Sequence, residues 1–118
     1  MADQHHDINY VELPAADIEA VKTFYSSAFG WQFEDYGPDY SSFNCGQLNG
    51  GFYRAPLSAS TENGSVLIVI FSTDLESSLN SVKSNGGIIS RDIFSFPGGR
   101  RFHFQDPNGN EMAVWAEP

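Results

Sequence analysis

Hydrophobic and polar residues alternate at the start of the chain and then change to a helical spacing. Residues 8–13 alternate with period two, which is typical of a strand with one buried face. Pro14 ends this strand, and apolar residues then recur at helical spacing along residues 18–29. Asp17 is suited to accept hydrogen bonds from the first free N–H groups of that helix, and Gly30 is suited to the left-handed conformation that ends it. The pattern predicts a strand followed by a capped helix.

The same pattern returns in the second half of the chain. Residues 65–71 (SVLIVIF) form an apolar run of strand length. After it, Asp74 and Gly87 stand 57 positions beyond Asp17 and Gly30. An internal repeat of this kind points to two copies of one supersecondary unit.

Each predicted helix is followed by three more predicted strands. Short alternating or apolar segments are separated by turn-forming Gly, Pro, Asn and Asp residues. They cover residues 31–34, 40–45 and 48–54, and then 88–94, 100–105 and 111–116.

The sequence therefore predicts one α+β domain over residues 1–118. It consists of two tandem βαβββ modules, 7–57 and 65–117, joined by a linker at 58–64 that is rich in small and polar residues. We expect the modules to form a curved mixed sheet around a cleft.

Composition narrows the classes of partner. The 118 residues carry a formal net charge of −9, which repels nucleic acid and anionic lipid and favours cationic ligands. Aromatic residues make up 14% of the chain, more than two short helices need to bury, so some rings are expected to line a cavity. No apolar run reaches the ~20 residues of a membrane span, and the first residues lack a secretory pattern. With Cys45 as the single cysteine, we expect a cytoplasmic protein without nucleic-acid or membrane partners.

Three motifs carry a resemblance to a known family. They are VELPAADIEAVKTFYSSAFGW in the first module, the Gly-Gly pair after the second predicted helix, and the closing DPNGNEMAVW. In this order they resemble the vicinal oxygen chelate superfamily, which includes glyoxalase I, bleomycin-resistance proteins and extradiol dioxygenases. The resemblance covers nearly the whole chain. It implies paired βαβββ modules, a cleft inside a curved sheet, and a homodimer.

The metal ligands of metal-using members have no equivalents here. The resemblance places these His and Glu positions on Tyr10, near Ile68, on Ala113 and in the strand around 50–54, where no His, Asp or Glu occurs. We therefore expect no metal and no cofactor. An alternative is a displaced site, because Glu12 and Glu111 each stand two residues from a lost position and two carboxylates can hold a hard cation weakly.

Strand parity predicts which side chains face the cleft. Pairing Gln105 with Asn110 across the DPNG turn would place Phe104 opposite Glu111 and Phe102 opposite Ala113. The predicted ligand-binding cleft is Tyr10, Glu12, Ile68, Phe102, Phe104, Glu111, Ala113 and Trp115.

Aromatic rings with two carboxylates suit a cationic or aromatic small molecule. The alternative is that the rings fill the sheet interior and the carboxylates are solvated. By the same parity, His103 is expected to face away from the cleft. Arg54, Arg100 and Arg101 are either anion contacts or solvated strand ends.

These observations lead to a functional hypothesis with two competitors. We expect a small-molecule binding protein of the glyoxalase/bleomycin-resistance type, without the metal site and acting as a homodimer. The first competitor is a lyase or isomerase that uses a displaced divalent metal, or Glu12 or Glu111 as general base. The second is a subunit or sensor module whose cleft is filled. The sequence assigns no catalytic residue.

Overall fold

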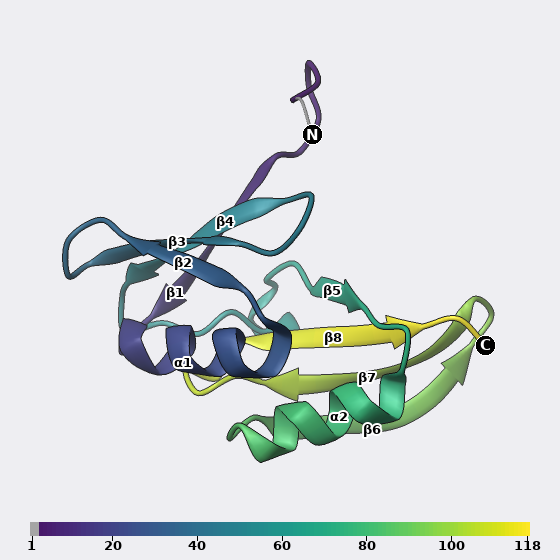
Figure 1. The fold of residues 1–118 in the computed structure, drawn as a ribbon. Coiled ribbons are helices and arrows are strands. Elements are labelled where there is room, and N and C mark those ends of the chain that lie inside the picture. The colour runs from purple at the N-terminus through teal and green to yellow at the C-terminus, as the bar shows by residue number, and fades with distance from the viewer. Residues whose placement is uncertain (1–2) are drawn as a thin grey trace.

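Each half of the chain folds into its own sheet with one helix, which confirms the predicted pair of βαβββ modules in an α+β fold (Figure 1). The computed structural model describes residues 3–118, so the predicted boundary at residue 1 lies outside the described residues. The first module contains β1 (Tyr10–Ala15), α1 (Ile18–Phe29), β2 (Gln32–Asp35), β3 (Tyr40–Asn44) and β4 (Asn49–Arg54). The second contains β5 (Ile68–Phe71), α2 (Leu75–Ser84), β6 (Ile88–Phe96), β7 (Gly99–Gln105) and β8 (Glu111–Ala116), and a 3-10 turn, η1 (Thr61–Asn63), precedes it in the linker.

Both helices begin at the predicted capping residues. The Asp17 carboxylate accepts a hydrogen bond from Ala20 N at 3.2 Å, and the Asp74 carboxylate accepts one from Ser77 N at 3.1 Å. Gly30 ends α1 at φ 74°, a conformation that costs glycine no steric penalty.

The two sheets repeat one topology. Sheet A has the strand order β1-β4-β3-β2, and sheet B has the order β5-β8-β7-β6. In each sheet the first strand pairs in parallel with the last, because the helix carries the chain across, and the other pairs are antiparallel. The internal repeat in the sequence thus corresponds to a repeat in structure.

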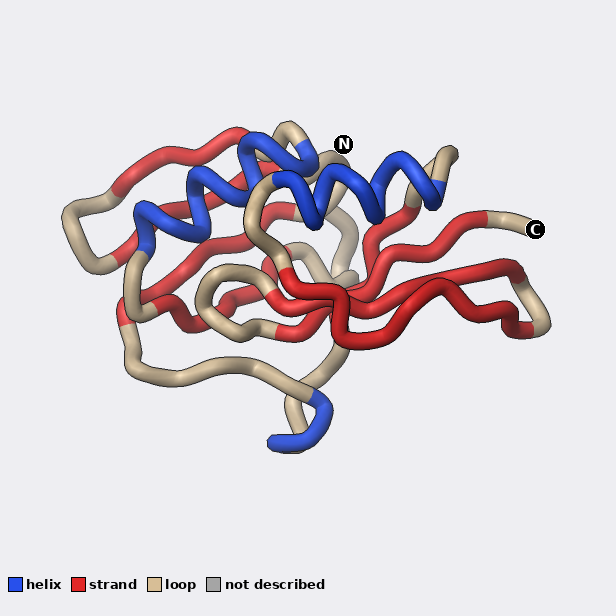
Figure 2. The backbone as a smooth tube through the Cα atoms, turned by 90° about the horizontal axis from the view of Figure 1, so that it is seen from below, coloured by secondary structure: helices blue, strands red, loops and turns tan. Residues whose placement is uncertain are grey.

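The two helices lie side by side, with α1 packed against sheet A and α2 against sheet B, and each helix covers one side of its sheet (Figure 2). We call this side of each sheet the core face and the opposite side the open face. On the core face of sheet A, Tyr25 of α1 stacks against Trp31 and Phe52, with ring centroids 4.5 and 5.6 Å apart. Phe24 of the same helix lies 5.8 Å from Phe104 of sheet B. Because α1 packs against both sheets, the two modules share one hydrophobic core.

The DPNGN turn between β7 and β8 joins the two modules by hydrogen bonds. Asn108 donates to the carbonyl oxygens of Pro14 and Leu57, and its own side-chain oxygen accepts from Ala16 N. Asn110, fully buried, donates to Pro14 O at 2.8 Å. This segment therefore fixes the end of β1 and the start of the linker against sheet B.

Asp106 is the anchor of this turn. It is only 3% exposed, and its carboxylate accepts hydrogen bonds from the backbone N–H groups of Asn108 and Asn110 and from the Tyr25 hydroxyl. Burial raises the pKa of Asp106, an effect that these hydrogen bonds oppose.

Neither helix of residues 3–118 is long and apolar enough to cross a membrane.

Candidate functional site

The eight residues predicted to line one cleft lie in three different places. Tyr10 and Glu12 lie on the open face of sheet A, whereas Glu111, Ala113 and Trp115 lie on the open face of sheet B. The other three, Ile68, Phe102 and Phe104, pack in the core.

The prediction for Phe102 and Phe104 was wrong because the register of the β7–β8 hairpin differs by one residue. Gln105 pairs with Glu111 rather than with Asn110, so Phe104 lies opposite Met112. The Asp106 carboxylate accepts hydrogen bonds from Asn108 N and Asn110 N, and Asn110 belongs to the turn rather than to β8. Since side chains alternate between faces, a shift of one residue exchanges the two faces of β7.

Two further positions need the same correction. Ile68 pairs with Met112 on the core face, and its neighbour Val69 takes the open face instead. His103 was expected to face away from Glu111, but the corrected register places both side chains on the open face, with His103 Nδ1 3.1 Å from Glu111 Oε2.

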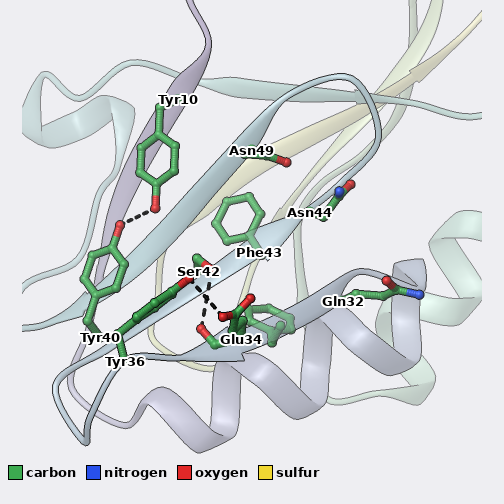
Figure 3. Close-up of a pocket in the computed structure, with 10 residues that line it drawn as sticks. Tyr10, Gln32, Glu34, Tyr36, Tyr40, Ser42, Phe43, Asn44 and Asn49 are labelled. Carbon is green, nitrogen blue, oxygen red and sulfur yellow. Dashed lines mark hydrogen bonds between the residues drawn. The ribbon is translucent and has the colours of Figure 1, made fainter. Parts of the chain in front are cut away.

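The open face of sheet A carries a pocket of about 650 Å³ (Figure 3). Its walls come from the edge strand β1, the strands β2 to β4, and the β2–β3 turn. The lining residues are Tyr10, Gln32, Phe33, Glu34, Tyr36, Tyr40, Ser42, Phe43, Asn44 and Asn49, and none of these described residues is Lys, Arg or His.

Tyr10, Tyr36, Tyr40 and Glu34 line this pocket, and Glu12 adjoins it through Tyr40. The Tyr40 hydroxyl donates to Glu12 Oε2 at 2.9 Å and forms a short hydrogen bond with the Tyr10 hydroxyl. Burial, together with these two hydrogen bonds, raises the pKa of Tyr40. Tyr36 donates to Glu34 Oε2 at 3.0 Å, which raises the pKa of Tyr36. The Tyr36 and Tyr40 hydroxyls thus stay protonated at physiological pH, and each is hydrogen-bonded to a carboxylate.

A pair of glycines in β4 makes room for aromatic rings on both faces of sheet A. A Cβ at Gly51 would overlap the Tyr40 ring and hydroxyl on the open face, and a Cβ at Gly50 would overlap the Phe43 ring on the core face. Tyr40 can therefore lie across β4 and reach Glu12 on β1.

The open face of sheet B carries a second, more polar pocket of about 470 Å³. It is lined by linker and sheet residues: Ser58, Ser60, Thr61, Glu62, Ser90, Arg91, His103, Gln105, Gly109 and Glu111. Glu111 accepts hydrogen bonds from Thr61 N and Thr61 Oγ1, both at 2.8 Å, and pairs with His103. The Thr61 backbone bond, followed by the His103 contact, holds the pKa of Glu111 below its ordinary value.

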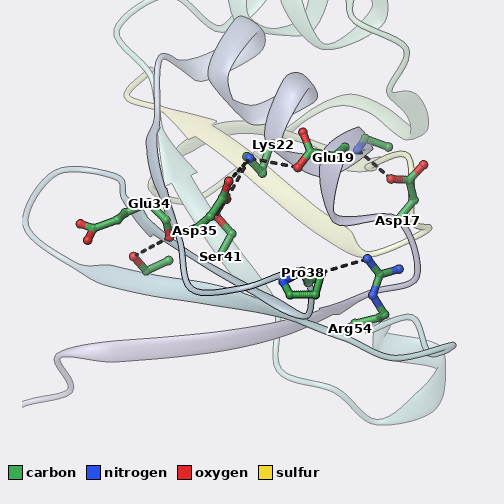
Figure 4. Close-up of polar contacts among 10 residues, drawn as sticks. Asp17, Glu19, Lys22, Glu34, Asp35, Pro38, Ser41 and Arg54 are labelled. Atoms are coloured by element: carbon green, nitrogen blue, oxygen red, sulfur yellow. Dashed lines mark hydrogen bonds and ion pairs between the residues drawn. The ribbon is translucent and has the colours of Figure 1, made fainter.

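Arg54 has a structural position. Its Nε forms an ion pair with Asp39 at 2.9 Å, and one of its other nitrogens donates to Ala16 O. The remaining nitrogen donates to Pro38 O at 2.9 Å (Figure 4). Arg100 pairs with Glu76 of α2 on the core side of sheet B.

The donor groups for a metal are dispersed. Among residues 3–118, no three His, Cys, Asp or Glu side chains come together as a ligand set. The structure fixes the register of β4, which places Asn49, Gly51 and Tyr53 on the side of Tyr10. None of these residues supplies an imidazole or a carboxylate.

Sequence reasoning missed Tyr36, Tyr40 and Glu34 as site residues. The resemblance directed attention to the first and last strands, whereas these three lie on β2, β3 and the turn between them. A usable signal was present, since Tyr40, Ser42 and Asn44 share one face of a predicted strand.

Comparison with known proteins agrees with this fold. Residues 7–114 match the family model of the Glyoxalase/Bleomycin resistance protein/Dioxygenase superfamily. A glyoxylase-like domain-containing protein from Didymella fabae is 29% identical over 129 residues, covering 97% of this chain and 96% of that protein.

Two solved structures show the same fold at low sequence identity. A glyoxalase-related enzyme from Fulvimarina pelagi has a TM-score of 0.80 and 17% identity, with 96% of this chain and 89% of the other covered. A glyoxalase/bleomycin resistance protein/dioxygenase family enzyme from Burkholderia phytofirmans PsJN has a TM-score of 0.79 and 16% identity, with 95% and 99% covered. The match along residues 7–114 shows that the chain belongs to the glyoxalase/bleomycin resistance protein/dioxygenase superfamily.

Proposed function

We propose that this chain is a small-molecule binding protein that holds a cationic aromatic ligand on the open face of sheet A without a metal. The observation that carries the proposal is the pocket of about 650 Å³ that Tyr10, Tyr36, Tyr40 and Glu34 line together. A pocket of this size is in the range that encloses small molecules.

The chemistry of the pocket favours a positive charge next to a ring. Tyr10 and Tyr36 are 42% and 60% exposed, so their ring faces are accessible to a ligand. A cation over such a ring gains roughly 0.5–2 kcal/mol per contact. Glu34 and Glu12 add two carboxylates, and none of the described lining residues offsets them. The net charge of −9 increases this attraction at longer range.

The lack of suitable metal-binding side chains at the ligand positions of metal-using members supports a function without the family's metal. Tyr10, Ala113 and the open-face residues of β4 cannot replace the His and Glu side chains that metal-using members employ. Glu12 is engaged by Tyr40, and Glu111 is engaged by Thr61 and His103. The donor set therefore does not fit a divalent ion.

The competing lyase or isomerase hypothesis has weaker support. A carboxylate that acts as general base near neutral pH needs a raised pKa, and the pKa of Glu111 is lowered. The raised pKa of Asp106 belongs to a buried carboxylate that holds the β7–β8 turn, away from both open-face pockets.

The experiment is a titration with benzyltrimethylammonium in which NMR monitors the ring resonances of the tyrosines. Saturable shifts are expected for this cation but not for benzoate. Glu34→Gln and Tyr10→Ala are each expected to weaken binding by roughly three- to tenfold. Glu117→Gln removes the same charge far from the pocket and serves as the matched control. Equal binding of benzoate and of the cation would overturn the proposal.

A second experiment separates binding from metal-dependent catalysis. The purified protein is soaked with zinc, nickel, manganese or iron(II), and its metal content is measured. We expect no stoichiometric metal. A metal that is retained, and is lost in Glu12→Gln or Glu111→Gln, would replace the binding proposal by the lyase or isomerase hypothesis.

We further propose that the protein is a homodimer, as the family resemblance implies. The edge strand β5 exposes Val69 and Phe71 to 42% and 52% on the open face of sheet B. Light scattering after size exclusion should give twice the monomer mass, and Val69→Lys should lower it. A constant monomer mass in the unmodified protein would contradict the proposal.

A further inference from the structure

Two buried nitrogens in the described part of the chain lack a hydrogen-bond partner, and both lie on one face of β7. They are Arg101 Nε and His103 Nε2. Because these residues are two apart on a strand, both side chains project from the open face of sheet B, about 6.6 Å from each other. Buried polar groups are nearly always paired, so two orphans at one place indicate a missing partner.

His103 is held so that Nε2 remains free. Glu111 accepts from Thr61 with one oxygen and contacts His103 Nδ1 with the other. An ionised carboxylate can only accept, so Nδ1 carries the hydrogen and donates it. Nε2 is then directed away from Glu111, toward the part of the sheet where Arg91 and Arg101 lie.

Two guanidinium groups lie near His103, and neither is paired with a carboxylate of the described residues. The Arg91 and Arg101 carbons Cζ lie 3.7 and 5.3 Å from the centroid of the Phe94 ring. Neither arginine forms an ion pair among residues 3–118, although the chain has 15 acidic residues and only six lysines and arginines. Glu111 and Glu62 line the same pocket as Arg91 and His103, and Glu111 is already engaged by Thr61 and His103.

We propose that the open face of sheet B binds a small oxyanion, a carboxylate or phosphate group, between Arg91, Arg101 and His103. Guanidinium groups are suited to this because their planar N–H donors match two oxygens at once. His103 Nε2 would accept from an O–H of the ligand or, in the protonated ring, donate to one of its oxygens. This site is separate from the pocket on sheet A, and its failure would leave that proposal untouched.

An aromatic side chain from an irregular edge strand adjoins the proposed site. Phe94 lies beside Arg101 and His103 and shields both nitrogens, with its ring centroid 5.9 Å from the imidazole. It belongs to β6, an edge strand whose register with β7 shifts on both sides of Arg91. Such irregular edge segments are common next to ligand sites. Oxyanion binding would require this ring to turn aside.

The test follows the imidazole resonances of His103 by NMR while sodium phosphate or sodium acetate replaces sodium chloride at constant ionic strength. His5 and His6 precede β1 and report any unspecific effect of salt or pH in the same spectrum. We expect a saturable shift of His103 alone. A response to phosphate assigns a phosphate-bearing ligand, and a response to acetate assigns a carboxylate. No saturable shift with either salt would overturn the proposal.

Neighbouring arginines give a matched pair of variants. Arg101→Gln should weaken oxyanion binding roughly tenfold or more, and Arg101→Lys, which keeps the charge but loses the planar fork, should weaken it less. Arg100→Gln removes the same charge one residue away, on the core side, where Arg100 pairs with Glu76. Binding should be unchanged in that variant. Equal losses of oxyanion affinity in Arg100→Gln and Arg101→Gln would show that only the net charge matters and would refute the site.

Discussion

Asn110→Asp exchanges one NH2 group for an oxygen at the junction of the two modules, and we expect it to be strongly destabilising. In the native protein Asn110 Nδ2 donates to Pro14 O at 2.8 Å and to Asp106 Oδ2 at 3.1 Å. The new carboxylate would keep the shape of the side chain and its contact with Ala59 N, which Asn110 Oδ1 now accepts at 2.8 Å. It would, however, turn two attractive contacts into repulsive ones.

The magnitude follows from these two contacts. A buried polar group that loses its partner costs roughly 1–3 kcal/mol, and a second carboxylate next to Asp106 adds repulsion. We therefore expect a loss of about 3–5 kcal/mol near neutral pH, a large part of the ~5–15 kcal/mol that stabilises a typical domain. The melting temperature should fall by roughly 10–20 °C.

The sign of the pH dependence makes the argument specific. Two carboxyl groups about 3 Å apart cannot both ionise, so the folded state raises the pKa of the pair above its unfolded value. When the pKa is higher in the folded state, the protein keeps its stability at a pH below the pKa of the unfolded state and loses it as the pH rises through the pKa of the folded state. The deficit of Asn110→Asp should thus be small near about pH 4 and large near about pH 8.

Urea unfolding at both pH values, compared with the unmodified protein, measures this deficit. Asn80→Asp makes the same chemical change on the exposed surface of α2, and it should cost less than about 0.5 kcal/mol. An equal deficit at low and neutral pH, or a deficit below about 1 kcal/mol at neutral pH, would refute the assigned hydrogen bonds.

Two further predictions concern β4 and the thiol. Gly51→Ala should displace the end of the Tyr40 side chain, which lowers the affinity for benzyltrimethylammonium roughly tenfold and changes the free energy of unfolding by less than about 1 kcal/mol. Gly50→Ala should instead lower the free energy of unfolding by about 1–3 kcal/mol, measured in urea, because the added methyl group overlaps buried atoms. The reverse order of effects would contradict the placement of the rings. Burial raises the pKa of the Cys45 thiol, which donates to Leu48 O at 2.9 Å. Cys45 should therefore react with Ellman's reagent far more slowly in the native protein than in the urea-unfolded chain. Equal reaction rates would refute the buried position of this thiol.

Local sequence signals predicted the elements well because each depends on a few neighbouring residues. Asp17 and Asp74 cap helices as expected, and Gly30 ends α1 in the left-handed conformation. The repeat between the halves corresponds to two sheets of identical strand order. The helix caps require no contact between distant parts of the chain, whereas the strand order rests on pairing of β1 with β4 and of β5 with β8.

The candidate site was predicted less well because it depends on registers and long-range contacts. A one-residue error at the turn after Gln105 exchanged the faces of β7, so Phe102 and Phe104 were assigned to the cleft and His103 was removed from it. Likewise, Tyr40 joins Glu12 only because Gly51 leaves space between them.

The sequence by itself determined the two βαβββ modules, their helix caps and the acidic character of the chain. Only the tertiary structure decided which side chains share a face. Alternation along a strand leaves that choice open until one pairing is known, and here the pairing of Gln105 with Glu111 decides it. The same packing brought three tyrosines together on sheet A and left Arg101 and His103 without partners on sheet B.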